Sequence, residues 1–326
     1  MTMTTVSFRP FTEADYPTLL ELMNAAYPDT PRYEQDVRLF DQQRDPQARF
    51  VRDLMQVGDR VVAAGEYETH RALPRAGRLA LRLFVPRAQW GQGLEVPLFD
   101  HLLARALEEG PSGLDTSVPE NSWELPFLQE RGFRETERMW HSVLDLSTFD
   151  AAPFVRFRQR AASAGVSLRP LDTLARDEAF QRRMYAAISE ILLDLPSATP
   201  FEPWPFELWQ ERAWNHPLRR HDLTLLALEG DEIVGIAELY GTHEPGALRI
   251  GLTGVRRPWR RRGVAQALKL EGTLRAREAG FERVRTVNHS VNRPMLAINE
   301  AMGFVKEPAT VHLALDLGAP GPRSES

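Results

Sequence analysis

This chain repeats itself, and the internal repeat constrains its fold more than any other property of the sequence. Four segments of the first half recur in the same order in the second half. The pairs are VSFRP (6–10) with VSLRP (166–170), VPRAQWGQGLEVPL (85–98) with VRRPWRRRGVAQAL (255–268), Asn121…Gly132-Phe133 with Asn292…Gly303-Phe304, and HSVLDL (141–146) with HLALDL (312–317). Because the order is kept, we interpret the chain as two copies of one domain.

The repeat predicts the domain organisation. One domain is expected at 1–147 and the other at 164–317, which suits the length of 326 residues. The segment between them, 148–163, is expected to be a short helical linker. The end, 318–326, is rich in Gly, Pro and Ser and is expected to be disordered.

Each copy shows the same coarse order of elements, clearest in the second copy. A strand leads into a helix expected at 172–195 with Asp172 as its cap. Two strands then flank the turn at 229–231, a hairpin signature. A further strand, an arginine-rich turn, a helix, a strand, a helix and a last strand follow. The pattern predicts an α/β (α+β) domain with a mixed, mostly antiparallel twisted sheet flanked by helices.

The charge balance argues against one class of function. The chain has 40 basic and 45 acidic residues and a formal net charge of −5, whereas a protein held to DNA by its field shows a basic excess. All but two of the basic residues are arginines, with lysine only at 269 and 306, so an arginine cluster alone is weak evidence. We expect no nucleic-acid partner.

Other sequence features indicate the compartment. The absence of cysteine removes disulfides, Cys-ligated metals and thiol nucleophiles. The start, MTMTTVSFRPFTEAD, lacks the regions of a signal peptide. No apolar run approaches the roughly 18 residues of a membrane span. We expect a cytoplasmic monomer or homodimer with no membrane partner and no metal.

The turn at 256–263 has the layout of an anion site. It connects a strand to a helix, and the first N–H groups of a helix have no internal partner and attract negative charge. Gly263 has no Cβ, so a diphosphate can approach the main chain, and Lys269 and the flanking arginines can add charge. Two alternatives stay open from the loop alone: a tight turn with solvated arginines, and a nucleic-acid patch.

The segment 253–304 resembles the acetyl-CoA motif of the GNAT superfamily of N-acetyltransferases. The family pattern Arg/Gln-x-x-Gly-x-Gly/Ala is matched by Arg260, Gly263 and Ala265. The resemblance continues through a Thr-x-Asn strand and an Asn-Glu…Gly-Phe ending at 299–304. The whole chain is similar to tandem GNAT proteins with an architecture of the mycothiol-synthase type, which implies two tandem GNAT domains.

The resemblance also implies where acetyl-CoA binds. The N–H groups of 261–265 would hold the pyrophosphate, and strand 248–255 would splay from strand 284–288 to admit the pantetheine arm. The N–H of Val255 would meet the thioester oxyanion. The implied cofactor-binding residues are Thr253, Gly254, Val255, Arg260, Arg261, Arg262, Gly263, Val264, Ala265, Asn288 and Asn292.

The first copy lacks the chemistry of this loop. Trp90 stands where the second copy has Arg260, and Glu95 stands where it has Ala265. A carboxylate in the first helical turn would repel a pyrophosphate, by roughly a few kcal/mol at the effective dielectric constant of a protein surface. We expect that the N-terminal domain binds no CoA; the alternative is that Glu95 turns outward and CoA still binds.

The acceptor end offers several candidate residues. Glu238 interrupts an apolar strand and is the leading general base, with a solvated glutamate as the alternative. Asn299 stands where the family often places a general-acid tyrosine. Tyr240, His289 or water would then supply the proton that the CoA thiolate takes up. Glu190 and Asp194 share a helix face and could bind a cationic substrate or be solvated.

The aromatic loop 201–214 offers a further candidate, Trp204, for the acceptor pocket, although most of its aromatic residues are expected to pack in a core. Those residues are Phe201, Trp204, Phe206, Trp209 and Trp214.

These observations lead to one expected function and two alternatives. We expect an enzyme that moves acetyl from acetyl-CoA to a primary amine of a small molecule by direct attack in a ternary complex. The active site is expected in the C-terminal domain. The alternatives are an acetyltransferase for a protein or peptide amine and a regulatory CoA-binding protein without turnover.

Overall fold

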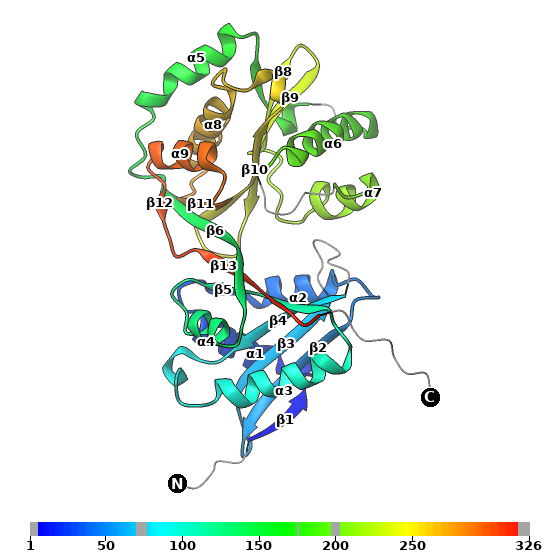
Figure 1. Ribbon diagram of the computed structural model, residues 1–326. Helices are drawn as coiled ribbons and strands as arrows, with labels where there is room; N and C mark the ends of the chain where they lie inside the picture. The colour runs from blue at the N-terminus through cyan, green and yellow to red at the C-terminus, as the bar shows by residue number, and fades with distance from the viewer. Residues whose placement is uncertain (1–5, 70–76, 175, 197–202, 319–326) are drawn as a thin grey trace. The chain divides into compact units, whose positions relative to one another are not determined.

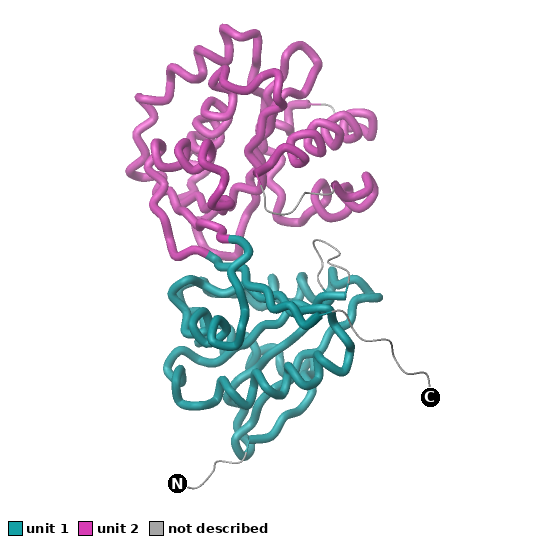
Figure 2. The backbone as a smooth tube through the Cα atoms, in the orientation of Figure 1, with its two compact units in different colours: residues 1–137, 310–326 teal, residues 138–309 magenta. Residues whose placement is uncertain are grey.

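The computed structural model describes residues 6–69, 77–174, 176–196 and 203–318. The chain divides into two compact units, which Figure 2 shows in different colours. Unit 1 comprises residues 1–137 and 310–326, and unit 2 comprises residues 138–309. Among the described residues, no helix combines the length and the apolar character needed to cross a membrane.

Unit 1 is a sheet with helices on both faces (Figure 1). Its strands are β1 (Val6–Pro10), β2 (Phe50–Val57), β3 (Arg60–Thr69), β4 (Arg78–Phe84), β5 (Gly113–Pro119) and β13 (Thr310–Asp316). Its helices are α1 (Tyr16–Ala26), α2 (Glu34–Gln42), α3 (Glu95–Glu108) and α4 (Glu124–Glu130), with short 3-10 turns η1 (Glu13–Asp15) and η2 (Arg87–Gln89). The strand order is β1-β2-β3-β4-β5-β13, with β4 and β5 parallel and the other neighbours antiparallel.

The period of two along its strands explains why this sheet buries both faces. Leu54 and Met55 are neighbours on β2 and point to opposite sides. Leu54 belongs to the core cluster of α1, together with Leu19, and Met55 belongs to the cluster of α3, together with Leu98. All four side chains are fully buried, so two apolar cores hold the sheet between its helices.

Unit 2 repeats this plan. Its strands are β6 (Arg134–Asp145, from residue 138 onward), β7 (Ser167–Pro170), β8 (Leu225–Glu229), β9 (Glu232–Gly241), β10 (Ala247–Val255), β11 (Arg283–His289) and β12 (Val305–Lys306). Its helices are α5 (Val155–Ser163), α6 (Glu178–Leu193), α7 (Phe206–Trp209), α8 (Val264–Glu278) and α9 (Arg293–Ala301), with short turns η3 (Ala152–Phe154), η4 (Leu171–Thr173), η5 (Gln210–Trp214) and η6 (Arg257–Trp259).

The strands of unit 2 follow the order β6-β11-β10-β9-β8-β7, with β12 on β6. Only β10 and β11 pair in parallel among the strand pairs of this unit that the structure describes. Figure 1 shows α6 and α7 on one face of the sheet and α8 and α9 on the other. Leu226 packs with Met184 of α6, and its neighbour Leu225 packs with Leu268 of α8. The expected mixed, mostly antiparallel sheet flanked by helices is thus confirmed.

The repeated last strands join the sheets in an order that the repeat does not predict. HLALDL at 312–317 falls largely in β13, which pairs with β5 of unit 1. HSVLDL at 141–146 falls largely in β6, which pairs with β11 of unit 2. The unit bounds therefore differ from the expected ranges 1–147 and 164–317, in which each copy keeps its own last strand. Both segments have the same apolar alternation, so pattern alone does not assign either to a sheet.

Two other expected bounds also differ in the structure. The segment 148–163 contains the expected helix, α5, but the helix belongs to unit 2 and packs on α8, where Arg158 Nη2 lies 2.5 Å from Glu271 Oε2. Asp172 lies in η4 and does not cap the next helix. Helix α6 begins at Glu178, because Asp177 is extended and its Oδ1 accepts a hydrogen bond of 2.8 Å from Phe180 N. Of the expected disordered tail, residues 319–326 lie outside the described residues.

Candidate functional site

A gap between two strands of unit 2 is the first part of the site. β10 and β11 pair only where residues 247–249 meet residues 283–285, although both strands continue beyond this point. The expected separation of the two strands is therefore present. Arg256 N–H bonds Val234 O at 2.9 Å, and groups in an antiparallel ladder alternate in direction, so the N–H of Val255 points away from β9. It is directed toward the side on which β11 has separated.

The loop that follows β10 has an unusual backbone conformation. Gly263 has φ 82° and Arg261 has φ 61°, and Arg261 is the one residue other than glycine with positive φ among the described residues. A side chain in this region is strained, and such strain is found where the surroundings enforce it. No side chain caps α8 at Gly263, and no backbone partner of the N–H groups of 262–265 is found among the described residues. These N–H groups lie together at the N-terminal end of α8.

Neighbouring elements hold the loop in this shape. Arg260 Nε donates to Val255 O at 2.8 Å, and Arg160 Nη2 of α5 donates to Arg261 O at 2.7 Å. A Cβ on Gly263 would lie 3.4 Å from the ring of Phe157 and 3.3 Å from Arg160. The α5 helix therefore packs directly against the loop and fixes it from the side of the helix.

Strand β10, which precedes the loop, packs closely against α6. A Cβ at Gly254 would lie 2.1 Å from Cγ2 of Ile191 in α6, so only glycine fits there. This contact ties α6 to the end of β10. Thr253, one residue earlier, is 8% exposed, and its Oγ1 has no hydrogen-bond partner in the described part of the chain. Both residues were expected at the cofactor site, and both lie beside the gap.

The two carboxylates expected to bind a cationic substrate instead contact the arginines of the loop region. Glu190 Oε2 lies 2.7 Å from Arg256 Nε. Asp194 lies 2.5 Å from Arg257 and 2.8 Å from Arg260, and hydrogen bonding from Arg257 holds the pKa of Asp194 below its ordinary value. Their negative charge is balanced within the protein, and they connect the C-terminal part of α6 to the loop after β10.

Glu238 and Tyr240 form a buried cluster with Arg219, which the sequence did not single out. Arg219 Nη2 donates to Glu238 Oε1 at 2.7 Å and its Nη1 donates to Tyr240 Oη at 3.2 Å. The side chain of Arg219 is fully buried, and Glu238 and Tyr240 are each 7% exposed. Burial raises the pKa of Tyr240 to about 12, so its hydroxyl stays protonated at neutral pH. Glu238 is therefore an ion-paired buried carboxylate and not a solvated one.

Asn299 is also buried, and it joins two other polar groups. Its Oδ1 lies 2.5 Å from Nζ of Lys269 on α8, and its Nδ2 donates to Oδ1 of Asn288 on β11 at 2.6 Å. Burial lowers the pKa of Lys269 to about 7. Asn292 caps α9, with its Oδ1 accepting from Met295 N at 3.3 Å. The structure thus brings Asn288 and Asn299 into contact and gives the side-chain oxygen of Asn292 a structural role.

The aromatic loop divides into core and surface residues. Phe206, Trp209 and Trp214 belong to the buried cluster of α6, as the packing alternative predicts. Trp204 is 39% exposed, and its carbonyl oxygen accepts a hydrogen bond of 2.6 Å from Tyr185 Oη. Phe201 lies outside the described residues. Within the described part of the chain, no group of three or more His, Asp or Glu residues is placed to hold a metal ion.

The matching loop of unit 1 has the same shape but different chemistry. Trp90 Nε1 donates to Val85 O at 2.9 Å, just as Arg260 Nε donates to Val255 O. Gly91 and Gly93 have φ 70° and 89°, matching Arg261 and Gly263 of the second loop. Glu95 opens α3, and its Oε2 is buried without a hydrogen-bond partner among the described residues. The turn is therefore retained, whereas the arginine is lost and a carboxylate is present in the first helical turn.

A tyrosine side chain contacts the backbone of β4 where the strands of unit 1 separate. β4 and β5 pair only where residues 78–80 meet residues 113–115, so they separate as β10 and β11 do. Tyr27 Oη lies 2.5 Å from Glu124 Oε2 and donates to Leu83 O of β4 at 3.2 Å. Glu124 is 2% exposed, and burial raises the pKa of its carboxyl to about 8. The half-buried Tyr27, paired with the buried Glu124, thus donates to a backbone acceptor of β4.

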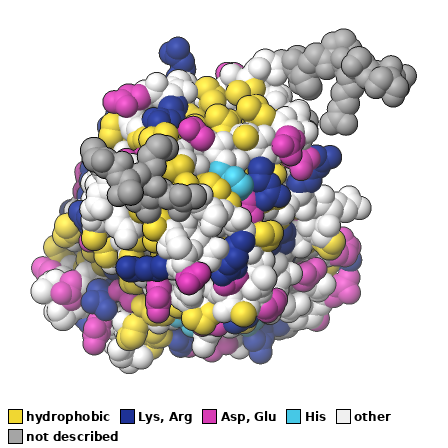
Figure 3. Space-filling model, turned by 90° about the horizontal axis from the view of Figure 1, so that it is seen from below, with side chains coloured by type: hydrophobic (Ala, Val, Ile, Leu, Met, Phe, Trp, Pro, Cys, Tyr) yellow, Lys and Arg dark blue, Asp and Glu magenta, His cyan; other side chains and the backbone are white. Residues whose placement is uncertain are grey.

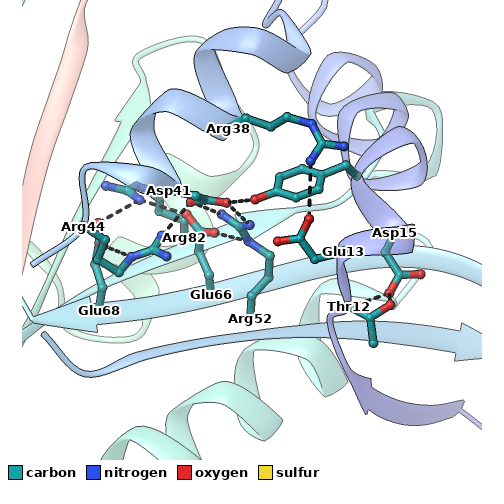
Figure 4. A network of polar contacts seen from close by, with 11 residues as sticks. Thr12, Glu13, Asp15, Arg38, Asp41, Arg44, Arg52, Glu66, Glu68 and Arg82 are labelled. Atoms are coloured by element: carbon teal, nitrogen blue, oxygen red, sulfur yellow. Dashed lines mark hydrogen bonds and ion pairs between the residues drawn. The ribbon is translucent and has the colours of Figure 1, made fainter. Parts of the chain in front are cut away.

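Unit 1 also has a counterpart of the Glu238 cluster. Glu66 of β3 lies 2.7 Å from Arg52 and 2.8 Å from Arg82. Figure 4 shows these three residues within a network that includes Asp41 and Glu68. Burial would raise the pKa of Glu66, but the charges of Arg52 and Arg82 outweigh burial and hold it below the ordinary value. In both units a glutamate on the third strand is thus held by buried arginine.

Sequence reasoning missed Arg219 and assigned Lys269 only a charge near the loop. Arg219 lies in a segment without a motif, and only the tertiary structure brings this segment beside β9, where Arg219 reaches Glu238. Lys269 had one signal: it is one of two lysines in a chain that otherwise uses arginine. Figure 3 shows Lys and Arg interspersed with Asp and Glu on one face of the molecule, without a continuous basic patch on that face.

Comparisons with known proteins concern the family and the fold. A model of the acetyltransferase (GNAT) family matches residues 189–304, and no curated protein sequence matches the chain. A GCN5-related N-acetyltransferase from Sphaerobacter thermophilus is 21% identical, with a TM-score of 0.70 and 95% of each chain covered. A tandem GNAT protein from the clavulanic acid biosynthesis pathway is 21% identical, with a TM-score of 0.71, 96% of this chain covered and 99% of that one.

A third solved structure covers almost the same length of this chain. It is a glucosamine N-acetyltransferase region of a fungal multi-domain enzyme, 12% identical with a TM-score of 0.71, and the match covers 97% of this chain and 38% of that one. At these identities the likeness establishes the fold. Residues 189–304 therefore match the acetyltransferase (GNAT) family model, and the described length of the chain has the fold of the tandem GNAT structures.

Proposed function

We propose that this chain is an acetyl-CoA-dependent N-acetyltransferase that acts on a primary amine of a small molecule, with its CoA site in unit 2. The observation that carries the proposal is the cradle at residues 261–265. The N–H groups of 262–265 have no backbone partner among the described residues, Arg261 has positive φ, and the segment opens a 15-residue helix beside a gap between two strands. Such a helix start binds phosphate.

The residues of unit 2 fit CoA along the length of that molecule. A pyrophosphate at 262–265 would meet main-chain donors, the positive end of the helix and the arginines beside them. The gap between β10 and β11 exposes strand N–H groups to an amide-containing arm such as pantetheine. The N–H of Val255, directed away from β9, is a donor for a carbonyl oxygen in the gap. When bound, acetyl-CoA supplies the acetyl group as an activated thioester.

The buried cluster of β9 provides the acceptor chemistry. An amine attacks only when neutral, and ordinary amine pKa values of about 8 to 10.4 leave most of it protonated at pH 7. Glu238 can accept that proton, and Arg219 stabilises the carboxylate and fixes its direction. Tyr240 accepts from Arg219, so its own hydroxyl proton stays available for donation to a substrate.

The choice of a small-molecule acceptor rests on analogy. The fungal neighbour is described as a glucosamine N-acetyltransferase, and the tandem neighbour belongs to a biosynthetic pathway for a small molecule. The alternatives are a protein or peptide amine and a regulatory CoA-binding protein. They differ in the acceptor, not in the CoA site.

Thiol release from acetyl-CoA with an amine panel tests the proposal. Because the chain contains no cysteine, a thiol-reactive dye reports only CoA. We expect turnover with at least one amino sugar, amino acid or polyamine. Turnover only with peptides would favour the protein-acetylating alternative. Tight CoA binding with no turnover on any amine would favour the regulatory alternative, and absence of CoA binding by calorimetry would refute all three.

We further propose that unit 1 binds no CoA. Glu95 in the first turn of α3 and the Tyr27–Glu124 pair in the strand gap both oppose binding, the first by charge and the second by occupancy. Calorimetry of the full chain should then give one CoA per chain. A stoichiometry of two would contradict this assignment.

A further inference from the structure

Lys269 is a buried lysine that pairs with no carboxylate of the described residues. Its side chain extends from α8, the residue is 4% exposed, and no carboxylate among the described residues forms an ion pair with it. Its partners are the amide oxygen of Asn299 at 2.5 Å and the ring of Phe304, 4.7 Å from Nζ. An unpaired buried charge is costly, and proteins retain such groups mostly where they have a task.

The ammonium faces a small hollow beneath the strand gap. The hollow is lined by residues of α8 and of β9, β10 and β11, including Thr253 and Val284 from the two strands that separate. Thr253 is more than nine-tenths buried, and its Oγ1 has no partner in the described part of the chain. The hollow therefore contains an unsatisfied hydroxyl and an unbalanced cation at the place where β10 and β11 diverge.

The surroundings keep the ammonium oriented and leave its charge unopposed. Asn299 accepts from Lys269 and donates to Asn288 Oδ1, so both ends of the asparagine amide are used and its orientation is set. Glu238 is the other titratable residue among the lining residues, and its carboxylate is paired with Arg219. The described lining residues from α8, β10 and β11 other than Lys269 itself are uncharged.

We propose that the ammonium of Lys269 is the cation that balances the negative charge on the CoA sulfur, with Asn299 as the residue that positions it. This inference rests on the proposed CoA site in unit 2. The pyrophosphate is placed at the loop after β10, so the pantetheine arm enters the gap from the end of that strand and its sulfur lies deeper, toward the hollow. A thiolate there would supply the missing counter-charge, and Thr253 Oγ1 would offer it a hydrogen bond.

Lysine-specific 15N NMR tests the inference on the unmodified protein. The chain has two lysines, so two Nζ signals are expected, and Lys306→Met assigns them. The signal of Lys269 should titrate near pH 7 without ligand, because burial lowers the pKa of its ammonium to about 7. With saturating CoA it should remain protonated at least one pH unit higher, since an anion stabilises the ammonium. Lys306 is the internal reference.

Desulfo-CoA separates the sulfur from the rest of the molecule. It keeps the pyrophosphate and the pantetheine amides, so it should bind at the same loop without raising the pKa of Lys269. An equal shift with CoA and desulfo-CoA would overturn the inference, because the anion sensed would not be the thiolate. CoA binding with no shift would also overturn it and leave the proposed function standing. Failure of CoA to bind would refute the proposed function itself.

Variants give a second readout, the ionisation of the bound thiol measured by its ultraviolet absorbance. Lys269→Met keeps an unbranched side chain of similar length. It should lower the ionisation constant of the thiol of bound CoA at least tenfold, which raises the thiol pKa. Asn299→Asp gives the ammonium an internal counter-charge and should act in the same direction. Lys306→Met is the matched control and should leave the thiol unchanged. A thiol pKa unaffected by both Lys269→Met and Asn299→Asp would refute the assignment.

Discussion

The loops at 85–98 and 255–268 have nearly the same backbone but opposite suitability for an anion. Each follows a strand that separates from its parallel neighbour, contains two residues with positive φ and opens a long helix. In each loop a side-chain nitrogen donates to the equivalent backbone oxygen: Trp90 Nε1 to Val85 O, and Arg260 Nε to Val255 O. The loop shape therefore does not depend on the charge of that residue.

The difference between the units lies in what occupies the gap and the helix start. Unit 1 places Glu95 in the first turn of α3, and Tyr27, paired with Glu124, on the backbone oxygen of Leu83 in β4. Unit 2 places Ala265 in the first turn of α8, and Thr253 Oγ1 beside its gap has no partner among the residues that the structure describes. A common scaffold can thus keep its fold while a few side chains change the chemistry of its helix start and strand gap.

The largest expected effects concern the two buried glutamates. Glu238→Gln leaves the fully buried Arg219 without a counter-charge, which should lower the free energy of unfolding by about 3–5 kcal/mol. Glu66→Gln should cost less, because Arg52 keeps Asp41 as a partner and Arg82 keeps Glu68. Urea denaturation of each variant measures this difference, and equal losses would contradict it.

The same pair of variants separates structure from catalysis. If Glu238 is the general base, Glu238→Gln lowers kcat by about 100-fold at neutral pH and recovers at high pH, where the amine is neutral without help. Glu66→Gln should leave the pH–rate profile unchanged. A profile that is the same in both variants and the parent protein would exclude Glu238 as the base.

The next largest effect is expected on CoA affinity, when the glutamate of the unit 1 loop is introduced at the equivalent position of unit 2. Ala265→Glu places a carboxylate in the first turn of α8, and repulsion of a few kcal/mol should weaken CoA binding about 100-fold. Ala265→Gln, of the same size without the charge, is the control and should lose little. Calorimetry measures both affinities, with circular dichroism to show that the fold is kept. Similar losses in both variants would show that size and not charge excludes the phosphate.

A smaller effect concerns the pH dependence of unit 1. Burial raises the folded-state pKa of Glu124 to about 8, above its unfolded value, so the folded state holds a proton that the unfolded state has released. This contribution is full below the unfolded pKa of about 4.3 and is lost as pH rises toward 8, by at most about 1.4 kcal/mol per unit. Glu124→Gln should remove this slope, whereas Glu130→Gln, at an exposed site on the same helix, should keep it.

The smallest effect concerns loop strain. Gly91 and Arg261 share a left-handed conformation, which glycine adopts freely. Arg261→Gly should raise the free energy of unfolding of unit 2 by about 0.5–1 kcal/mol, and Gly91→Arg should lower that of unit 1 by a similar amount. Arg262→Gly, at a residue without positive φ, should destabilise instead. A loss of stability in Arg261→Gly would show that contacts of its side chain outweigh the strain.

Much of this site follows from local sequence. The glycine at 263 and the small residue at 265 after a strand predict the cradle, because the donors at a helix start depend only on the helix and the absence of bulk. The same loop in the first copy predicts its loss of phosphate chemistry through Glu95. The partners of Glu190 and Asp194 were not predictable, because charge spacing on one helix does not tell which arginines another element brings to it.

By itself the sequence determined the repeat, the order of elements, the two loops and the alternating strands, because these depend on residues close together in the chain. Only the tertiary structure decided which last strand joins which sheet, since both copies of that strand have the same pattern. It also decided that Arg219 holds Glu238, that Lys269 lies buried beside Asn299, and that Tyr27 pairs with Glu124 at β4. Each of these depends on groups far apart in sequence, where burial and partner together set charge and reactivity.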